Sequence, residues 1–192
     1  MRIVGGTFRG RPLASPKHEG LRPTSDRVRE SLFNILEHGV SDFSLKGTRV
    51  IDLFAGTGAL GLEALSRGAA FCLFVEDQAE ARALIRTNVE AMQLAGRARI
   101  FRRDATKLGD AGTMSAFGLA FLDPPYGKQL GEQALQALAT GGWLTPGAIV
   151  VLEERAGAKV QIPDQFSEID RRTYGDTQVL LARFEANAES IA

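Results

Sequence analysis

Short apolar runs separated by stretches of helical periodicity dominate the chain from residue 49 onward. They are rich in Val, Ile, Leu and Phe and do not alternate with polar residues, as is typical of strands covered on both faces. The pattern therefore predicts five buried strands, with the sequences RVIDLF (49–54), FCLFVE (71–76), ARIFRR (98–103), GLAFLD (118–123) and AIVVLE (148–153).

Three segments between these runs, residues 60–67, 79–94 and 130–139, are predicted to be helices. Strand and helix in regular alternation indicate a parallel, doubly wound α/β sheet. The later stretch FSEIDRRTYGDTQVLLARF predicts two more strands joined at Tyr174, Gly175 and Asp176. The predicted fold is thus a mostly parallel, seven-stranded α/β sheet that ends in an antiparallel hairpin.

The first 40 residues follow a different pattern. RIVGGTFRGRPL predicts a short hairpin, and a loop rich in Pro, Gly and charge follows it. Thr24 or Ser25 can cap a helix with Asp26 in its first turn, and apolar residues then recur at helical spacing. We therefore divide the chain into a basic N-terminal hairpin and helix, residues 1–40, and a single compact domain, residues 41–192.

Charge is balanced over the 192 residues, with 23 basic and 23 acidic side chains, but it is distributed unevenly. Residues 1–30 hold three acidic side chains and seven basic ones, namely Arg2, Arg9, Arg11, Lys17, Arg22, Arg27 and Arg29. A basic arm on a mildly acidic body suggests that a polyanion is held at one end. The alternative is an ordinary solvated surface segment.

Cysteine content and hydropathy exclude other classes of protein. Cys72 is the single cysteine, so an intrachain disulfide and a cysteine-based zinc site are both excluded. No charged-then-apolar leader opens the chain, and no apolar run approaches the roughly 18 residues of a membrane span. We expect a soluble, cytoplasmic, monomeric protein without a metal or a membrane partner.

A glycine-rich turn follows the first predicted strand. Gly56, Gly58 and Gly61 match G-x-G-x-x-G, and Glu76 ends the next strand, twenty residues after Gly56. Such glycines allow a tight turn and the acidic residue can bind ribose hydroxyls, which on its own indicates a dinucleotide. Asp52, however, would repel a pyrophosphate and can face an ammonium group, which favours S-adenosylmethionine as the cofactor. The alternative is a glycine turn that only packs a helix on a strand.

Two further strand ends carry candidate binding residues. After the third strand, Asp104 can accept the adenine amino proton while the Ala105 amide faces a ring nitrogen, although Asp104 alone also fits a helix cap. After the fourth strand, FLDPPYGK places a carboxylate, two prolines and an aromatic ring in succession. Asp123 and the Pro124 carbonyl can each accept an N–H bond from an exocyclic amine, and Tyr126 can stack a base that has left its helix.

These motifs resemble a known family. DLFAGTG followed by DPPY resembles the amino-group methyltransferases that use S-adenosylmethionine. GGTFRGRPL, LRPTSDRVRESLFN and GALGLEALSRGA are, more specifically, similar to the bacterial 16S ribosomal RNA guanine-N2 methyltransferases, which modify the guanine numbered 966. The similarity covers nearly the whole chain, including the YGDT hairpin. It implies the class I, Rossmann-like methyltransferase fold and a substrate RNA within the small ribosomal subunit.

The resemblance also implies roles for individual residues. The catalytic loop would be Asp123, Pro124, Pro125 and Tyr126, and Arg9, Arg11, Arg22, Arg27 and Arg29 would contact RNA phosphates. Cofactor contacts would come from Asp52, Phe54, Gly56, Gly58, Glu76, Asp77, Asp104, Ala105 and Asp123. The alternative for Arg27 and Arg29 is pairing with Asp26 and Glu30 on the helix surface.

The target base and the reaction leave alternatives open. Guanine has donors at both N1 and N2, which suits an ionised carboxylate that only accepts, so Asp123 favours guanine over adenine. Other methyltransferases with this tetrad act on adenine, and DNA adenine or a protein glutamine remains an alternative target. A nicotinamide-dependent oxidoreductase or a non-catalytic nucleotide-binding module would leave DPPY and Asp52 without a purpose.

Overall fold

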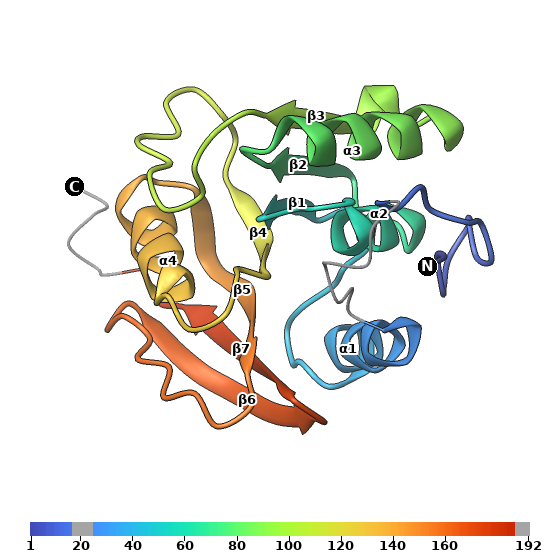
Figure 1. Ribbon diagram of the computed structural model, residues 1–192. Coiled ribbons are helices and arrows are strands. Elements are labelled where there is room, and N and C mark those ends of the chain that lie inside the picture. Colours follow the sequence, from blue (N-terminus) through green and yellow to red (C-terminus); the bar gives the residue numbers. More distant parts are fainter. Residues whose placement is uncertain (17–24, 187–192) are drawn as a thin grey trace.

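The apolar runs of the sequence form the centre of one mixed sheet (Figure 1). The computed structural model describes residues 1–16 and 25–186. Its helices are α1 (Asp26–His38), α2 (Ala59–Ser66), α3 (Ala79–Ala91), the short 3₁₀ helix η1 (Ala95–Arg97) and α4 (Leu130–Thr140). Its strands are β1 (Arg49–Leu53), β2 (Phe71–Val75), β3 (Ala98–Phe101), β4 (Phe117–Leu122), β5 (Leu144–Arg155), β6 (Phe166–Tyr174) and β7 (Thr177–Phe184).

The seven strands lie in the order β3-β2-β1-β4-β5-β7-β6. The first five along the chain are parallel, while β7 runs antiparallel between β5 and β6. The predicted fold class is confirmed, including the closing hairpin. The chain adds β2 and β3 on one side of β1, then returns to add β4 and β5 on the other. Ligands of doubly wound sheets bind at such a reversal, outside the carboxyl ends of the strands.

Both faces of β1, β2 and β4 are buried, which explains why polar residues do not alternate with apolar ones in these strands. Cys72 and Phe74 of β2 belong to one core with residues of α1, α2 and α3. Leu73 and Val75 belong to a second core with residues of α4. Successive side chains of a strand point to opposite faces, so each strand contributes to both cores.

The start of β5 differs from the prediction. This strand begins at Leu144, ahead of the predicted residue 148, and includes Pro146 and Gly147. Proline removes a ladder donor and glycine weakens a strand, so a central strand is not expected to contain them. The chain accommodates both with a register shift in the β4–β5 ladder between Phe117 and Leu119.

The N-terminal segment folds back on itself as predicted, but with a single isolated bridge between Arg2 and Pro12. The segment is also bonded to the body of the protein: Glu63 of α2 accepts the Val4 and Gly5 amides at 2.8 and 2.7 Å. Ile3 and Leu13 are buried in the same core as α1 and α2. The segment is therefore anchored to the body of the protein by side-chain carboxylate bonds and apolar packing.

Asn88 of α3 joins this segment to the glycine-rich turn. Its amide group donates to the Ala14 carbonyl at 3.2 Å and to the Thr57 carbonyl at 3.1 Å. Its carbonyl accepts the Ala14 amide at 2.7 Å. Asn88 is buried, and these bonds occupy both N–H donors and its carbonyl oxygen. One side chain thus holds two segments that are far apart in sequence.

Ser25 caps α1, because its hydroxyl oxygen accepts the Val28 amide at 3.2 Å, and Asp26 lies in the first turn as predicted. Within the described residues, no helix is long and apolar enough to cross a membrane.

Candidate active site

The carboxyl ends of β1 and β4 meet at the point where the strand order reverses (Figure 1). The last residues of these strands, Leu53 and Leu122, are paired in the parallel ladder. Phe54 and Asp123 follow them directly, so the glycine-rich turn and the DPPY loop leave the sheet next to each other. The structure therefore brings together the two motifs that sequence places about 70 residues apart.

The glycine-rich turn has an unusual backbone. Phe54, Gly56 and Gly58 have φ values of 57°, 55° and 78°, in the left-handed region. Residues other than glycine rarely adopt this conformation. Phe54 therefore stores backbone strain of about 1–3 kcal/mol, as is common at functional sites. The turn reverses the chain sharply between β1 and α2, and α2 begins at once after Gly58.

Gly61 serves packing rather than conformation. A Cβ at this position would lie 2.4 Å from Phe74 Cε1 and 2.5 Å from Cys72 Sγ. The Gly61 amide also donates to Asp52 Oδ2 at 3.0 Å. Glycine here allows α2 to approach β1 and β2 closely, as the third glycine of the motif predicts.

Replacing Gly61 with alanine is expected to lower the free energy of unfolding by about 1–3 kcal/mol, because the added methyl group overpacks a close contact. Urea denaturation followed by circular dichroism measures this loss. Gly96→Ala is the matched control, since a Cβ there has no neighbour within 4 Å. Equal denaturation midpoints for the two variants would refute the packing role.

Glu76 supports the turn from the end of β2. One of its carboxylate oxygens accepts the Gly56 amide at 2.8 Å and the other accepts the Gln78 amide at 2.9 Å. A carboxylate has about four acceptor sites, so two remain for ribose hydroxyls. Burial raises the pKa of Glu76, whereas the hydrogen bonds donated by the Gln78 and Gly56 amides lower it. The neighbouring Asp77 raises the pKa as well. The Asp77 side chain is exposed beside it.

Asp52 lies beneath the turn and is almost fully buried. Its bond with the Gly61 amide only partly offsets the loss of hydration. Burial, together with the nearby charge of Glu76, raises the pKa of Asp52 to about 8. A buried carboxyl group with this pKa is poised to ionise when a cation binds next to it.

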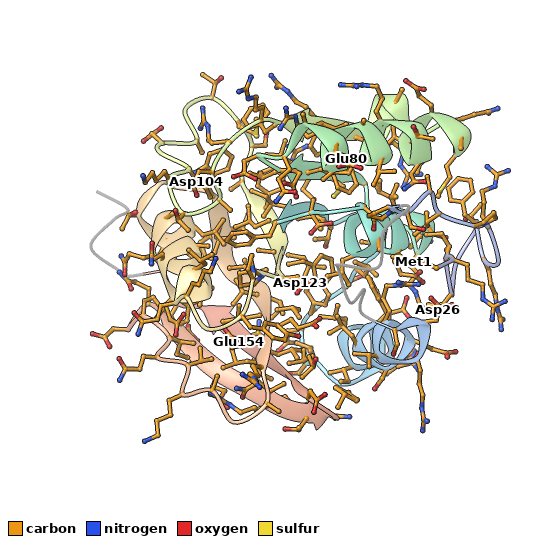
Figure 2. The ribbon with its side chains drawn as sticks, viewed as in Figure 1. Met1, Asp26, Glu80, Asp104, Asp123 and Glu154 are labelled. Carbon is orange, nitrogen blue, oxygen red and sulfur yellow. The ribbon has the colours of Figure 1, made fainter. Side chains whose placement is uncertain are left out.

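Asp123 directly follows β4, and the charges of Asp52 in β1 and of Glu153 and Glu154 near the end of β5 act on its carboxyl group. Figure 2 labels Asp123 and Glu154. Burial raises the pKa of Asp123 well above its usual range, and Glu153, Asp52 and Glu154 raise it further by like-charge repulsion. Glu153 and Glu154 are themselves buried. The site therefore disfavours anions and favours a ligand that brings positive charge.

Tyr126 is held beside the Glu153 carboxylate by its hydroxyl group. The phenol donates to Glu153 Oε1 at 3.0 Å and lies 2.9 Å from the Thr177 hydroxyl. The side chain is nevertheless 39% exposed, so part of the ring is available to stack against a ligand. Burial, the largest cause, and the neighbouring Glu153 raise the pKa of Tyr126. Pro124 is buried and Pro125 is exposed on the same loop.

Asp104 and Ala105 follow β3 as predicted, but Asp104 does not cap a helix. Its carboxylate accepts the Thr106 amide at 2.8 Å and the Thr106 hydroxyl at 2.7 Å. These bonds lower the pKa of Asp104, so it stays ionised and can accept further N–H donors. The Ala105 side chain is buried in the core shared with α4.

The predicted RNA-binding arginines fall into different environments. Arg9, Arg11 and Arg27 are exposed, although Arg11 also donates to the Ala91 carbonyl at 2.7 Å. Arg22 lies outside the described residues.

The assignment of Arg29 to RNA contact is wrong. This side chain is 0% exposed, binds the Asp26 carboxylate at 2.8 Å and also donates to the Arg2 carbonyl. It lies 3.8 Å from the buried Glu63 carboxylate, and it therefore anchors the N-terminal segment and cannot reach a phosphate.

Sequence reasoning missed Glu153, Glu154 and Thr177. The two glutamates had a usable signal, because they end a buried strand just as Asp123 does. Thr177 had none, since its proximity to Tyr126 depends on how the β6–β7 hairpin lies against β5.

Comparison with known proteins agrees with this architecture. The family model described as Conserved hypothetical protein 95 matches residues 1–183. Ribosomal RNA small subunit methyltransferase D of Escherichia coli K12 is 39% identical, over 100% of this chain and 94% of the relative. The Haemophilus influenzae protein of the same name is 33% identical, over 91% of this chain and 89% of its own.

Solved structures give the same picture. yhhF of Escherichia coli, a proposed methyltransferase, has a TM-score of 0.82 at 33% identity, covering 97% of this chain and 99% of its own. A hypothetical protein of Thermus thermophilus has a TM-score of 0.72 at 30% identity, covering 94% of this chain and 98% of its own. The sheet and its helices thus form an α/β methyltransferase fold.

Proposed function

Since the chain belongs to the family described as Conserved hypothetical protein 95, we propose that it transfers a methyl group from S-adenosylmethionine to a guanine N2 amine in small-subunit ribosomal RNA. The motif resemblance points to guanine 966 as the target, in the 30S subunit or an assembly intermediate. The activity in the name of the relatives, methyltransferase D, supports RNA of the small subunit as the substrate class.

The carboxylate cluster is the observation that carries the choice of cofactor. Asp52, Glu76 and Asp123 all have raised pKa values because they are buried near like charges. A pyrophosphate would add to this repulsion, whereas a ligand with a sulfonium and an ammonium group relieves it. This argument favours S-adenosylmethionine over a nicotinamide dinucleotide.

The residues present fit the parts of that cofactor. The two remaining acceptor sites of Glu76 suit ribose hydroxyls, and the exposed, ionised Asp104 suits the adenine amine. Asp52 suits the ammonium group, while the strained turn from Phe54 to Gly58 leaves room for close approach. When bound, the cofactor supplies an electrophilic methyl group.

The DPPY loop would prepare the amine for attack. In the carboxylate form Asp123 accepts one N–H bond, and the rigid Pro124 carbonyl accepts the other, which directs the nitrogen lone pair toward the methyl group. Positive charge in the site lowers the pKa of Asp123 and so favours the form that accepts. The Asp123 carboxylate would also be placed to accept the proton that the amine loses when it takes the methyl group.

The N-terminal extension, residues 1–40, would position the RNA. Arg9, Arg11 and Arg27 are exposed, and contacts with phosphates fix a strand without reading its sequence. Residues 41–192 would carry the catalytic domain.

The proposed function is tested by radiolabelled methyl transfer onto unmethylated 30S subunits, naked 16S RNA and DNA in parallel. Nuclease digestion and nucleoside identification should give N2-methylguanosine from the ribosomal substrate. Methyl-adenine as the product, or label in DNA alone, would overturn the proposal.

Binding of S-adenosylhomocysteine at pH 7 is expected to release protons. Asp52 has a pKa of about 8 in the ligand-free protein, so it is mostly protonated at pH 7. An adjacent ammonium group lowers this pKa, the carboxyl group ionises, and affinity rises as the pH increases from 6 to 8.

Titration calorimetry in buffers of different ionisation enthalpy measures this release. Asp52→Asn should abolish most of it, and Asp164→Asn, a change at an exposed loop position, should not. Identical enthalpies in all buffers would contradict the assignment of Asp52.

Replacing Arg9 and Arg11 with glutamine is expected to weaken binding to 30S subunits and to flatten its salt dependence. Each lost phosphate contact reduces the slope of log K against log salt by about 1. Filter binding between low and moderate salt measures the slope, with Arg86→Gln, an exposed arginine of α3, as the control. An unchanged slope in the double variant would exclude the arm from RNA contact.

A further inference from the structure

A cavity is lined by residues of α1 and of the end of β6 with the turn that joins it to β7. Figure 1 shows α1 beside this end of the hairpin. Its volume is about 410 Å³, and it is lined by Arg27, Val28, Ser31, Tyr174 and Gly175. This volume is within the roughly 300–1,000 Å³ typical of pockets that hold small organic ligands. None of the cofactor or catalytic assignments above uses it.

The lining of this cavity suits a nucleotide. Arg27 is exposed and supplies a cation at the rim. Val28 and Tyr174 are partly buried against the core and form an apolar wall with an aromatic ring. The hydroxyl groups of Ser31 and Tyr174 are 2.8 Å apart and fix that ring against α1. An apolar aromatic wall next to a cation matches a base next to a phosphate.

The cavity is connected to the DPPY loop through the hairpin. Tyr174 and Thr177 are direct cross-strand partners at the end of the β6–β7 ladder. Side chains of such partners lie on the same face, with Cβ atoms about 4.5–5.5 Å apart. Because the Thr177 hydroxyl is 2.9 Å from the Tyr126 hydroxyl, the aromatic wall of the cavity adjoins the ring proposed to stack the target base.

We propose that this cavity binds the nucleotide next to the target guanine in the RNA strand. The proposal rests on the proposed function, since it concerns the same RNA. A target base that turns out of the strand onto Tyr126 no longer stacks on the adjacent base. The adjacent base then needs another surface to stack against. Tyr174 and Val28 supply that surface, and Arg27 binds the phosphate that links the two nucleotides.

Two variants of the full-length protein test this subsite. Val28→Trp fills the cavity without changing charge, and Arg27→Gln removes the cation at its rim. Each should raise the Kd for unmethylated 30S subunits in filter binding, and the KM in methyl transfer, by about tenfold. The effect should fall on Kd and KM much more than on kcat. Only Arg27→Gln should reduce the salt dependence of binding, because Val28→Trp removes no charge.

Controls separate this subsite from other effects. Asn34→Trp places the same ring at an exposed position of α1, and Arg86→Gln removes an arginine from α3. Both should leave Kd for 30S subunits within about twofold of the original, and the affinity for S-adenosylhomocysteine should be the same in all four variants. If Val28→Trp proves unstable on thermal melting, Val28→Phe at the same position decides, because weaker binding by Arg27→Gln also follows from general phosphate contact by the N-terminal extension.

The outcomes are distinguishable. Unchanged Kd and KM in the cavity variants, with methyl transfer by the original protein intact, would overturn the subsite and leave the proposed function standing. Absence of methyl transfer to 30S subunits by the original protein would overturn both.

Discussion

Asp123→Asn is expected to lower kcat for methyl transfer to 30S subunits by about 100- to 1,000-fold, the cost of losing one preorganised polar contact to a reacting group. The asparagine amide cannot carry the negative charge, and one of its two polar ends donates where the amine also donates. Single-turnover methyl transfer with radiolabelled cofactor measures the loss.

The same substitution should not destabilise the fold. Asp123 stands among Asp52, Glu153 and Glu154, so removing its charge relieves repulsion. The free energy of unfolding is therefore expected to stay equal or to rise, while Asp164→Asn leaves both activity and stability unchanged. Full activity in Asp123→Asn would remove this carboxylate from the mechanism.

Glu63→Ala is expected to cause the largest loss of stability, about 3–5 kcal/mol, because it removes a buried carboxylate that binds two backbone amides and pairs with two largely buried arginines. The Glu63 carboxylate is fully buried, binds Arg67 at 2.8 Å, lies 3.8 Å from Arg29 and accepts the amides of Val4 and Gly5. Its removal leaves the Val4 and Gly5 amides without their acceptor. Arg29 and Arg67 each lose one carboxylate partner and keep another, Asp26 and Glu37 respectively.

Urea denaturation measures the effect of Glu63→Ala. Glu90→Ala, at an exposed position of α3, is the matched control and should cost well under about 1 kcal/mol. Protection of the Val4 and Gly5 amides in hydrogen exchange should fall in the Glu63 variant. A loss below about 1 kcal/mol would show that the N-terminal segment is held by its apolar contacts instead.

Most of the fold could be predicted from local pattern. Strands buried on both faces leave an uninterrupted apolar run, and five such runs located β1 to β5. The start of β5 could not be found this way, because a strand that tolerates Pro146 and Gly147 depends on a register shift with β4.

The candidate site divides in the same way. The proximity of Gly56 and Gly58 to Glu76 could be predicted from their spacing along the chain, because β1 and β2 are adjacent parallel strands whose carboxyl ends lie side by side. Arg29 was misassigned because its neighbour Glu63 is 34 positions away, and only helix packing brings the two together. The bond of Tyr126 with Thr177 spans 51 positions and has no local signature.

The three bonds of Asn88 set a limit on how this architecture can be re-engineered. Grafting the N-terminal segment onto an unrelated protein would leave the Ala14 amide and carbonyl without the Asn88 side chain that binds both. Because Asn88 also binds the Thr57 carbonyl, a chimera has to keep the N-terminal segment, the glycine-rich turn and α3 together.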